Sequence, residues 1–163
     1  MQLFPGPNYR VIDRVGMPQV MRFVAAALEP FDTSRLDWLK LLPLKQKALL
    51  HGQCDFPWSP GIDNDARAHG YRIRASVNIE MAPPFTYLHW GRVSATHNSR
   101  GWVSGEQEFR FDDLEECAVH TLAHECFHFL SDSGQVAESN TEANANWWAD
   151  RWLERYRGQQ SER

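Results

Sequence analysis

Hydrophobic positions alternate with polar ones in the middle of the chain and follow a helical repeat towards its end. Over residues 71–81 every second side chain is apolar, which is typical of a strand with one buried face. Shorter patterns predict strands over residues 44–54, 87–93 and 106–111. Residues 55–70, rich in Pro, Gly, Asp and Asn, predict a loop.

Apolar residues spaced three and four apart predict three helices. Residues 19–28 form the first, which ends at Glu29-Pro30. The second follows Asp112, which we expect to be its N-cap with Glu115 as the capping-box partner. Its apolar face contains Val119, Leu122, Ala123, Cys126, Phe129 and Leu130. The third helix is expected from about Thr141 to Tyr156, and the order of elements predicts an α+β fold.

His124, Glu125 and His128 spell H-E-x-x-H inside the second predicted helix. Positions i and i+4 lie about 40° apart on a helix, so both imidazoles can bind one metal ion from the same side. Glu125 lies beside them, where its carboxylate can take a proton from metal-bound water. The motif predicts a Zn²⁺ site of the metallopeptidase kind. The alternative, a surface helix whose histidines bind no metal, fits less well because the histidines border an apolar face.

The third protein ligand of such a site has two candidates, Glu142 and Glu138. Residues 142–149 read E-x-x-A-N-x-x-A, and the small alanines allow this helix to approach the first closely, so that Glu142 faces the paired histidines. Ser139 and Glu142 also match a capping box, which would use the carboxylate locally and leave the ligand role to Glu138 in the loop. Geometry favours Glu142.

The two segments together resemble the gluzincin peptidases. Residues 120–128 match H-x-x-A-H-E-x-x-H, and residues 142–149 match E-x-x-A-[DN]-x-[FY]-A with Trp148 at the aromatic position. The chain looks closest to the small soluble SprT-like and ImmA/IrrE groups of bacteria, phages and mobile elements. The resemblance covers residues 112–157, and upstream of them it is a similarity of layout alone.

This resemblance implies a zincin-like metallopeptidase domain, in which a small mixed sheet packs on the HExxH helix and on the following helix with its Glu ligand. It implies zinc held by His124, His128 and Glu142, with Glu125 as the catalytic base. An extended protein or peptide substrate would lie along an edge strand beside the cleft. The chain departs from the family in having no Cys-rich zinc ribbon, and in carrying Asn146 where membrane gluzincins carry Asp.

Other polar residues have candidate roles. A hydrolytic transition state needs a donor for its oxyanion. The residues with suitable chemistry are Tyr87, His89, His97 and Arg100. Each of these also fits an ordinary surface or core role. His120 shares the stripe of the ligands and is interpreted as a supporting or structural residue, whereas Asp150 and Glu154 are expected to be solvated charges.

Net charge, hydropathy and cysteine content limit the partners and the cellular setting that we expect for this chain. A formal charge of −4 gives no electrostatic case for nucleic acid, and no apolar run approaches the roughly 18 residues of a membrane span. Three separate cysteines and no recognisable leader favour a reducing, cytoplasmic setting. We therefore expect one domain over residues 1–163 that hydrolyses peptide bonds of a protein. The alternative is a zinc-bearing or metal-free protein-interaction module, with exposed tryptophans such as Trp147 as the binding surface.

Overall fold

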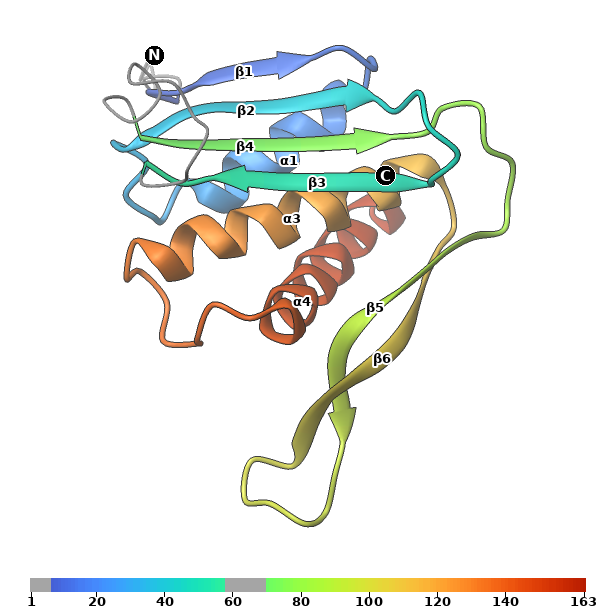
Figure 1. The fold of residues 1–163 in the computed structure, drawn as a ribbon. Helices are drawn as coiled ribbons and strands as arrows, with labels where there is room; N and C mark the ends of the chain where they lie inside the picture. The colour runs from blue at the N-terminus through green and yellow to red at the C-terminus, as the bar shows by residue number, and fades with distance from the viewer. Residues whose placement is uncertain (1–6, 58–69) are drawn as a thin grey trace.

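The computed structural model describes residues 7–57 and 70–163, so most of the loop predicted over residues 55–70 lies outside the described residues. Within them the chain forms a four-stranded sheet, a two-stranded hairpin and the helices α1, α3 and α4 (Figure 1). The architecture is α+β, as the sequence predicts.

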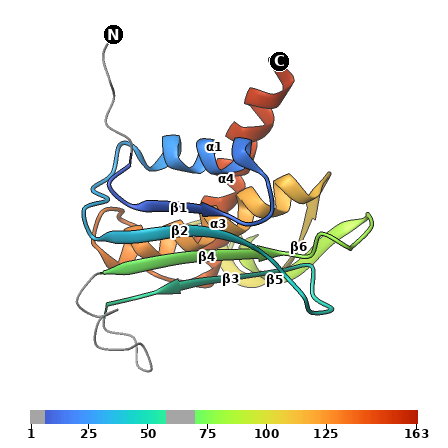
Figure 2. The same cartoon turned by 90° about the horizontal axis from the view of Figure 1, so that it is seen from above.

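The four-stranded sheet has the order β1-β2-β4-β3. Strands β1 (Arg10–Asp13), β2 (Leu36–Pro43) and β4 (Tyr71–Val77) run parallel, and β3 (Leu50–Asp55) is an antiparallel edge strand. Parallel neighbours need a crossover, and α1 (Pro18–Leu28) supplies it between β1 and β2. This helix lies behind the strands in Figure 1 and to one side of them in Figure 2.

Helix α3 (Leu114–Asp132) lies at the centre of the molecule, because it packs against β3 and β4 on one side and against α4 (Glu142–Ser161) on another. Thirteen of the 19 residues of α3 are buried. Burying one large aliphatic side chain contributes roughly 1.5–3 kcal/mol, so this packing fixes the helix firmly. The fully buried side chains that join it to the sheet and α1 include Val20, Val24, Leu39, Leu41, Ile73, Val119, Leu122 and Leu130.

Strands β5 (Phe85–Ser94) and β6 (Trp102–Phe111) form a separate antiparallel hairpin that projects away from the sheet (Figure 1). The base of the hairpin is held by buried phenylalanines, Phe85, Phe109 and Phe111. Because β6 leads almost directly into α3, and β5 packs along α4, the base of the hairpin lies beside both helices.

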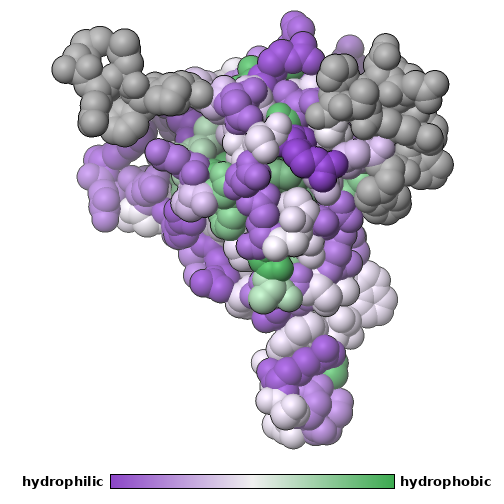
Figure 3. All heavy atoms as spheres, turned by 90° about the vertical axis from the view of Figure 1, so that its left-hand side faces the viewer, coloured by the Kyte–Doolittle hydropathy of each residue, from purple (hydrophilic) through white to green (hydrophobic). Residues whose placement is uncertain are grey.

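Arg92 fastens the hairpin to α4. Its Nε and Nη2 donate to Oδ1 of Asn144 over 3.1 and 2.8 Å, and its guanidinium lies 4.3 Å from the ring centre of Trp102 and 3.9 Å from that of Trp147. Trp147, which the sequence suggests as an exposed binding residue, is therefore half-buried and stacked within the chain. The surface seen in Figure 3 is mostly hydrophilic with small hydrophobic areas. None of the described helices has the length and hydrophobicity that a membrane span needs.

The sequence patterns do not predict β1 or β2. Strand β2 lies between two neighbours, with Trp38 buried on one face and Leu39 and Leu41 buried on the other, so its pattern does not alternate. The strand predicted over residues 71–81 ends at Val77. The next residue, Asn78, donates from its side chain to the carbonyls of Gln46 and Ala48, in the segment before β3.

The start of α3 lies one residue later than expected. Asp113, not Asp112, is the N-cap, because its carboxylate accepts a hydrogen bond from the backbone N–H of Glu116 over 2.8 Å. Glu116, not Glu115, is the acidic residue that reaches back, and it accepts from the N–H of Asp112, one residue before the N-cap, over 2.7 Å.

Glu116 also anchors α4. Nε and Nη2 of Arg157 each lie 2.7 Å from a different carboxylate oxygen of Glu116, which is buried. Burial raises the pKa of Glu116, but the hydrogen bonds from Arg157 and Asp112 outweigh it, so the pKa lies below its ordinary value. This ion pair holds the start of α3 to the end of α4.

We predict that Glu116→Gln lowers the free energy of unfolding by roughly 1–2 kcal/mol at neutral pH. This value lies between those measured for exposed ion pairs and for buried ion pairs, because Arg157 is partly exposed. A carboxyl whose pKa is lowered by folding stabilises the protein above its unfolded pKa of about 4.3, and loses that effect as the pH falls through the folded pKa. Urea denaturation at pH 7 and near pH 3 should show the difference between the two proteins shrinking in acid. Glu154→Gln, at an exposed position of α4, is the control and should change little; equal stability of Glu116→Gln and wild type at pH 7 would contradict the prediction.

Candidate metal centre

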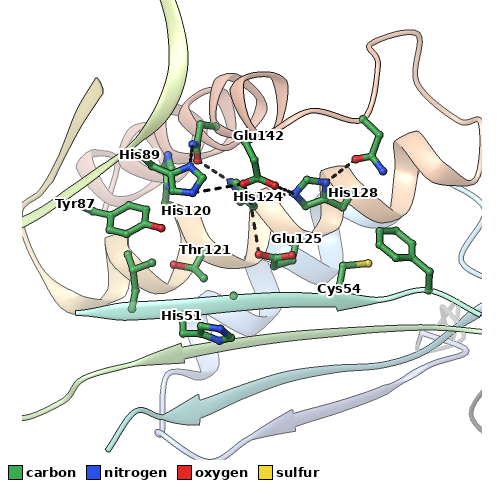
Figure 4. Close-up of a pocket in the computed structure, with 15 residues that line it drawn as sticks. His51, Cys54, Tyr87, His89, His120, Thr121, His124, Glu125, His128 and Glu142 are labelled. Atoms are coloured by element: carbon green, nitrogen blue, oxygen red, sulfur yellow. Dashed lines mark hydrogen bonds and ion pairs between the residues drawn. The ribbon is translucent and has the colours of Figure 1, made fainter. Parts of the chain in front are cut away.

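His124 and His128 lie one turn apart on α3, at the border between its buried face and a cleft. Each side chain is 12 % exposed, so the two rings are shielded from behind and open towards the cleft. Their Nε2 atoms are 3.1 Å apart and face the same point (Figure 4). The helical spacing of the motif thus brings the two imidazoles together as predicted.

Glu142, the first residue of α4, lies opposite the two rings. Its Oε2 is 3.0 Å from Nε2 of His124, and its Oε1 is 3.2 Å from Nε2 of His128. Thr141 caps the helix by accepting from the N–H of Asn144, so the alternative capping box between Ser139 and Glu142 does not form and the carboxylate is left for the histidines. The helix runs on to Ser161, beyond the expected end at Tyr156.

The donor set fits a metal ion. Ligand atoms of His124, His128 and Glu142 all lie within 4.8 Å of one another. Ligands around a tetrahedral zinc ion lie about 3.3 Å apart, from bond lengths of 2.0–2.1 Å, and the observed separations of 3.0–3.2 Å are close to this value. These three residues can therefore hold one metal ion.

Two asparagines orient the histidine rings. Nδ1 of His124 is 2.7 Å from Oδ1 of Asn146, and Nδ1 of His128 is 2.6 Å from Oδ1 of Asn140. An amide oxygen only accepts, so each Nδ1 donates and carries the hydrogen. Each Nε2 is then left with its lone pair towards Glu142, which is the arrangement that a metal-binding imidazole needs.

Glu125 lies between α3 and the edge strand β3 (Figure 4). Its carboxylate is 3.9 Å from Nε2 of His124. The residue as a whole is 7 % exposed. Burial raises the pKa of Glu125, while the two histidines act in the opposite direction. A Cβ atom at Gly52 of β3 would overlap Oε1 of Glu125, so this carboxylate occupies space that only a glycine leaves open.

The charges in the cleft are coupled. His124 and His128, which donate to Glu142 from Nε2 when their rings are protonated, lower the pKa of Glu142 well below its ordinary value. Burial opposes the charged form of His128, but Glu142 and Asn140 together raise its pKa. The site therefore concentrates negative charge at Glu142 and favours a cation at the point where the three side chains meet.

The cleft has a volume of about 450 Å³ and is built from four elements. Besides α3 and α4, the edge strand β3 contributes Leu50, Gly52 and Cys54, and β5 contributes Tyr87 and His89. Burial raises the pKa of the Cys54 thiol, which keeps it neutral and unlike a metal-binding thiolate.

Of the four candidate oxyanion donors, two lie in the cleft. Tyr87 and His89 line it, with ring centres 5.3 Å apart and planes at 14°. His97 and Arg100 lie on the far turn of the hairpin, where both are exposed, so they have the ordinary surface role that the sequence also allows. Glu138 is not among the ligand group, and its backbone carbonyl accepts a hydrogen bond from Ser131 in the loop before α4.

His120, which is buried, pairs with the partly exposed Asp150 behind the ligands. Nε2 of His120 is 2.9 Å from Oδ1 of Asp150, so Asp150 is not simply a solvated charge, whereas Glu154 is exposed as expected. Burial lowers the pKa of His120 although Asp150 opposes this. Glu142, Asn146 and Asp150 follow each other at intervals of four, and that spacing is a signal that could have identified Asp150 from the sequence. Asn140 and Gly52 carry no such signal.

Comparison with protein-family models, with curated proteins and with solved structures finds no match. The assignment of the site therefore depends on its geometry and chemistry.

We predict that Glu142→Ala loses bound metal and Glu138→Ala keeps it. Removing a carboxylate ligand should weaken metal affinity by a large factor, whereas Glu138 does not reach the ligand group. Metal content after dialysis, measured by mass spectrometry, checks this, with the double variant His124→Ala/His128→Ala as the metal-free reference. Metal retained in Glu142→Ala and lost in Glu138→Ala would reverse the assignment.

Proposed function

We propose that this chain is a zinc-dependent peptidase of the gluzincin type, with a zincin-like domain, that hydrolyses peptide bonds of a protein or peptide. The observation that carries the proposal is the carboxylate of Glu125, buried directly beside a His-His-Glu metal-binding group in a cleft that reaches an edge strand. His124, His128 and Glu142 would hold the zinc ion.

Zinc bound by these residues would act as a Lewis acid that lowers the pKa of water and polarises a carbonyl group. Glu125 is suited to the proton transfers. Its raised pKa makes it a stronger base than an exposed carboxylate, so it can take a proton from the attacking water and then pass it to the leaving amine. The bond that forms joins the water oxygen to the carbonyl carbon, and the bond that breaks is the peptide C–N bond.

The edge strand supports a peptide as the substrate. Strand β3 is paired with β4 alone among the described strands, so its other edge carries backbone N–H and C=O groups that can bind an extended chain. Leu50, Gly52 and Cys54 of this strand line the cleft, and a peptide added to β3 would pass over Glu125. Tyr87 and His89, across the cleft on β5, are the candidate donors for the carbonyl oxygen as it becomes negative.

A zinc-bearing interaction module without catalysis has weaker support. Structural zinc sites usually have four protein ligands, whereas three residues form the group here. A structural site also has no use for a buried carboxylate such as Glu125 beside its ligands. A metal-free interaction domain loses its named candidate, because Trp147 is stacked against Arg92, and among the described tryptophans Trp90 is the one that remains exposed.

We predict that Gly52→Ala lowers hydrolysis without removing the metal. The new Cβ would displace the carboxylate of Glu125, while the ligand residues contact other parts of the cleft. General-base catalysis contributes about 10²–10⁴-fold, and a displaced base should lose a large part of it. Gly105→Ala, in the hairpin, is the matched control, because its Cβ would meet only the exposed Val93 side chain. Full activity in Gly52→Ala would argue against Glu125 as the base.

The direct test is Glu125→Gln, assayed with an unfolded protein such as casein. The amide keeps the shape of the side chain but cannot accept the proton, so zinc content should be unchanged and hydrolysis should fall by at least about 10²-fold. Cleavage at nearly the wild-type rate would show the proposed mechanism to be wrong. Zinc loss in this variant would instead make Glu125 a ligand.

A further inference from the structure

Asn146 makes more contacts than a support for one metal ligand requires. The residue is 1 % exposed. Its Oδ1 is 2.7 Å from Nδ1 of His124, and its Nδ2 is 2.5 Å from the carbonyl oxygen of Trp90 and 2.9 Å from Nδ1 of His89. One amide thus connects α3, α4 and the hairpin.

The carbonyl of Trp90 determines which way the amide points. A carbonyl oxygen only accepts, so the NH₂ end of Asn146 must face it and the oxygen end must face His124. The second hydrogen of the NH₂ group then points to His89. Donating this hydrogen to Nδ1 of His89, 2.9 Å away, requires a His89 ring with no hydrogen on Nδ1, whereas a ring with that hydrogen would donate it to the Trp90 carbonyl.

We propose that Asn146 is a positioning residue that fixes opposite tautomers in two histidines, leaving His124 with a lone pair on Nε2 and His89 with a hydrogen on Nε2. The lone pair of His124 faces the ligand group and is available to a metal ion, and the N–H of His89 faces the same cleft as a hydrogen-bond donor. Nε2 of His89 lies 3.6 Å from Oε2 of Glu142, so the N–H is directed at the place where the ligands meet. The catalytic use of this donor rests on the proposed peptidase function, but the assignment of the tautomers does not.

The surroundings hold the ring of His89 in this position. Tyr87 stacks on one face of it, and His124 meets it edge-on with ring centres 5.8 Å apart. The backbone of β5 is fixed by the bond from Asn146 to Trp90 and, two residues further on, by Arg92. A rigid donor in a partly enclosed cleft stabilises developing negative charge without having to reorganise.

Asparagine and aspartate are not equivalent at this position. A carboxylate could still accept from His124, but it has no hydrogen for Trp90 or His89. It would repel the Trp90 carbonyl, and it would favour the His89 tautomer with the hydrogen on Nδ1. Nε2 of His89 would then face the cleft as a lone pair. Asn146 is therefore required for its donor end as much as for its oxygen.

The experiment measures the tautomer of His89 by nitrogen-15 NMR of protein labelled at its histidines. It is done near pH 8, above the ordinary imidazole pKa of about 6.5, so that the rings are neutral. In the wild type, His89 should carry its hydrogen on Nε2, and His124→Ala should leave that signal in place. In Asn146→Asp the hydrogen should move to Nδ1 while zinc content is retained. Asn144→Asp adds the same charge two residues away, next to Arg92, and should leave the His89 tautomer unchanged.

Finding the hydrogen on Nδ1 of wild-type His89 would overturn the inference, and this measurement stands even if Asn146→Asp fails to fold. An unchanged His89 tautomer in folded Asn146→Asp would overturn it as well, because Asn146 would then act through His124 alone. If the wild type cleaves casein, Asn146→Asp should be slower by about 10²–10³-fold, the usual effect of losing one oxyanion donor, with the loss in kcat. If the tautomers are as stated and no cleavage is found, the positioning role stands and the peptidase proposal fails.

Discussion

The antiparallel contact between α3 and α4 is the constraint on which the site depends. Three histidines on successive turns of α3 each meet a polar residue on successive turns of α4: His120 with Asp150, His124 with Asn146, and His128 with Glu142. Buried Ala145 and Ala149 let the helices approach closely enough for these pairs to form. Because each pair repeats at an interval of four, the register of one helix on the other determines all three, and a shift by one residue would dismantle the site.

The local part of this arrangement could be predicted from the sequence, and the part that depends on distant segments could not. The spacing of His124, Glu125, His128 and the choice of Glu142 follow from the pitch of a helix, which the sequence reveals. The start of α3 was predicted one residue too early, because Asp113 with Glu116 has the same spacing as Asp112 with Glu115. Tertiary contact distinguishes the two, since Glu116 also pairs with Arg157.

The strands were harder to predict for a physical reason. Alternation shows which strands have one buried face, as β4 does, but β2 is buried on both faces and gives no alternation. The approach of Gly52 to Glu125, and of His89 to Asn146, joins residues separated by more than fifty positions. No periodicity within a single element contains that information, so the walls of the cleft had to come from the structure.

The origin of the ligands in two different helices has a thermodynamic consequence. A metal ion held between α3 and α4 binds the folded chain and not the unfolded one, so it stabilises the fold by mass action. At a free concentration of about 100 times Kd, the gain is about 2.7 kcal/mol. A metal ion that binds this group should therefore raise the melting temperature of the protein, and a chelator should lower it, which gives a measure of occupancy that needs no substrate.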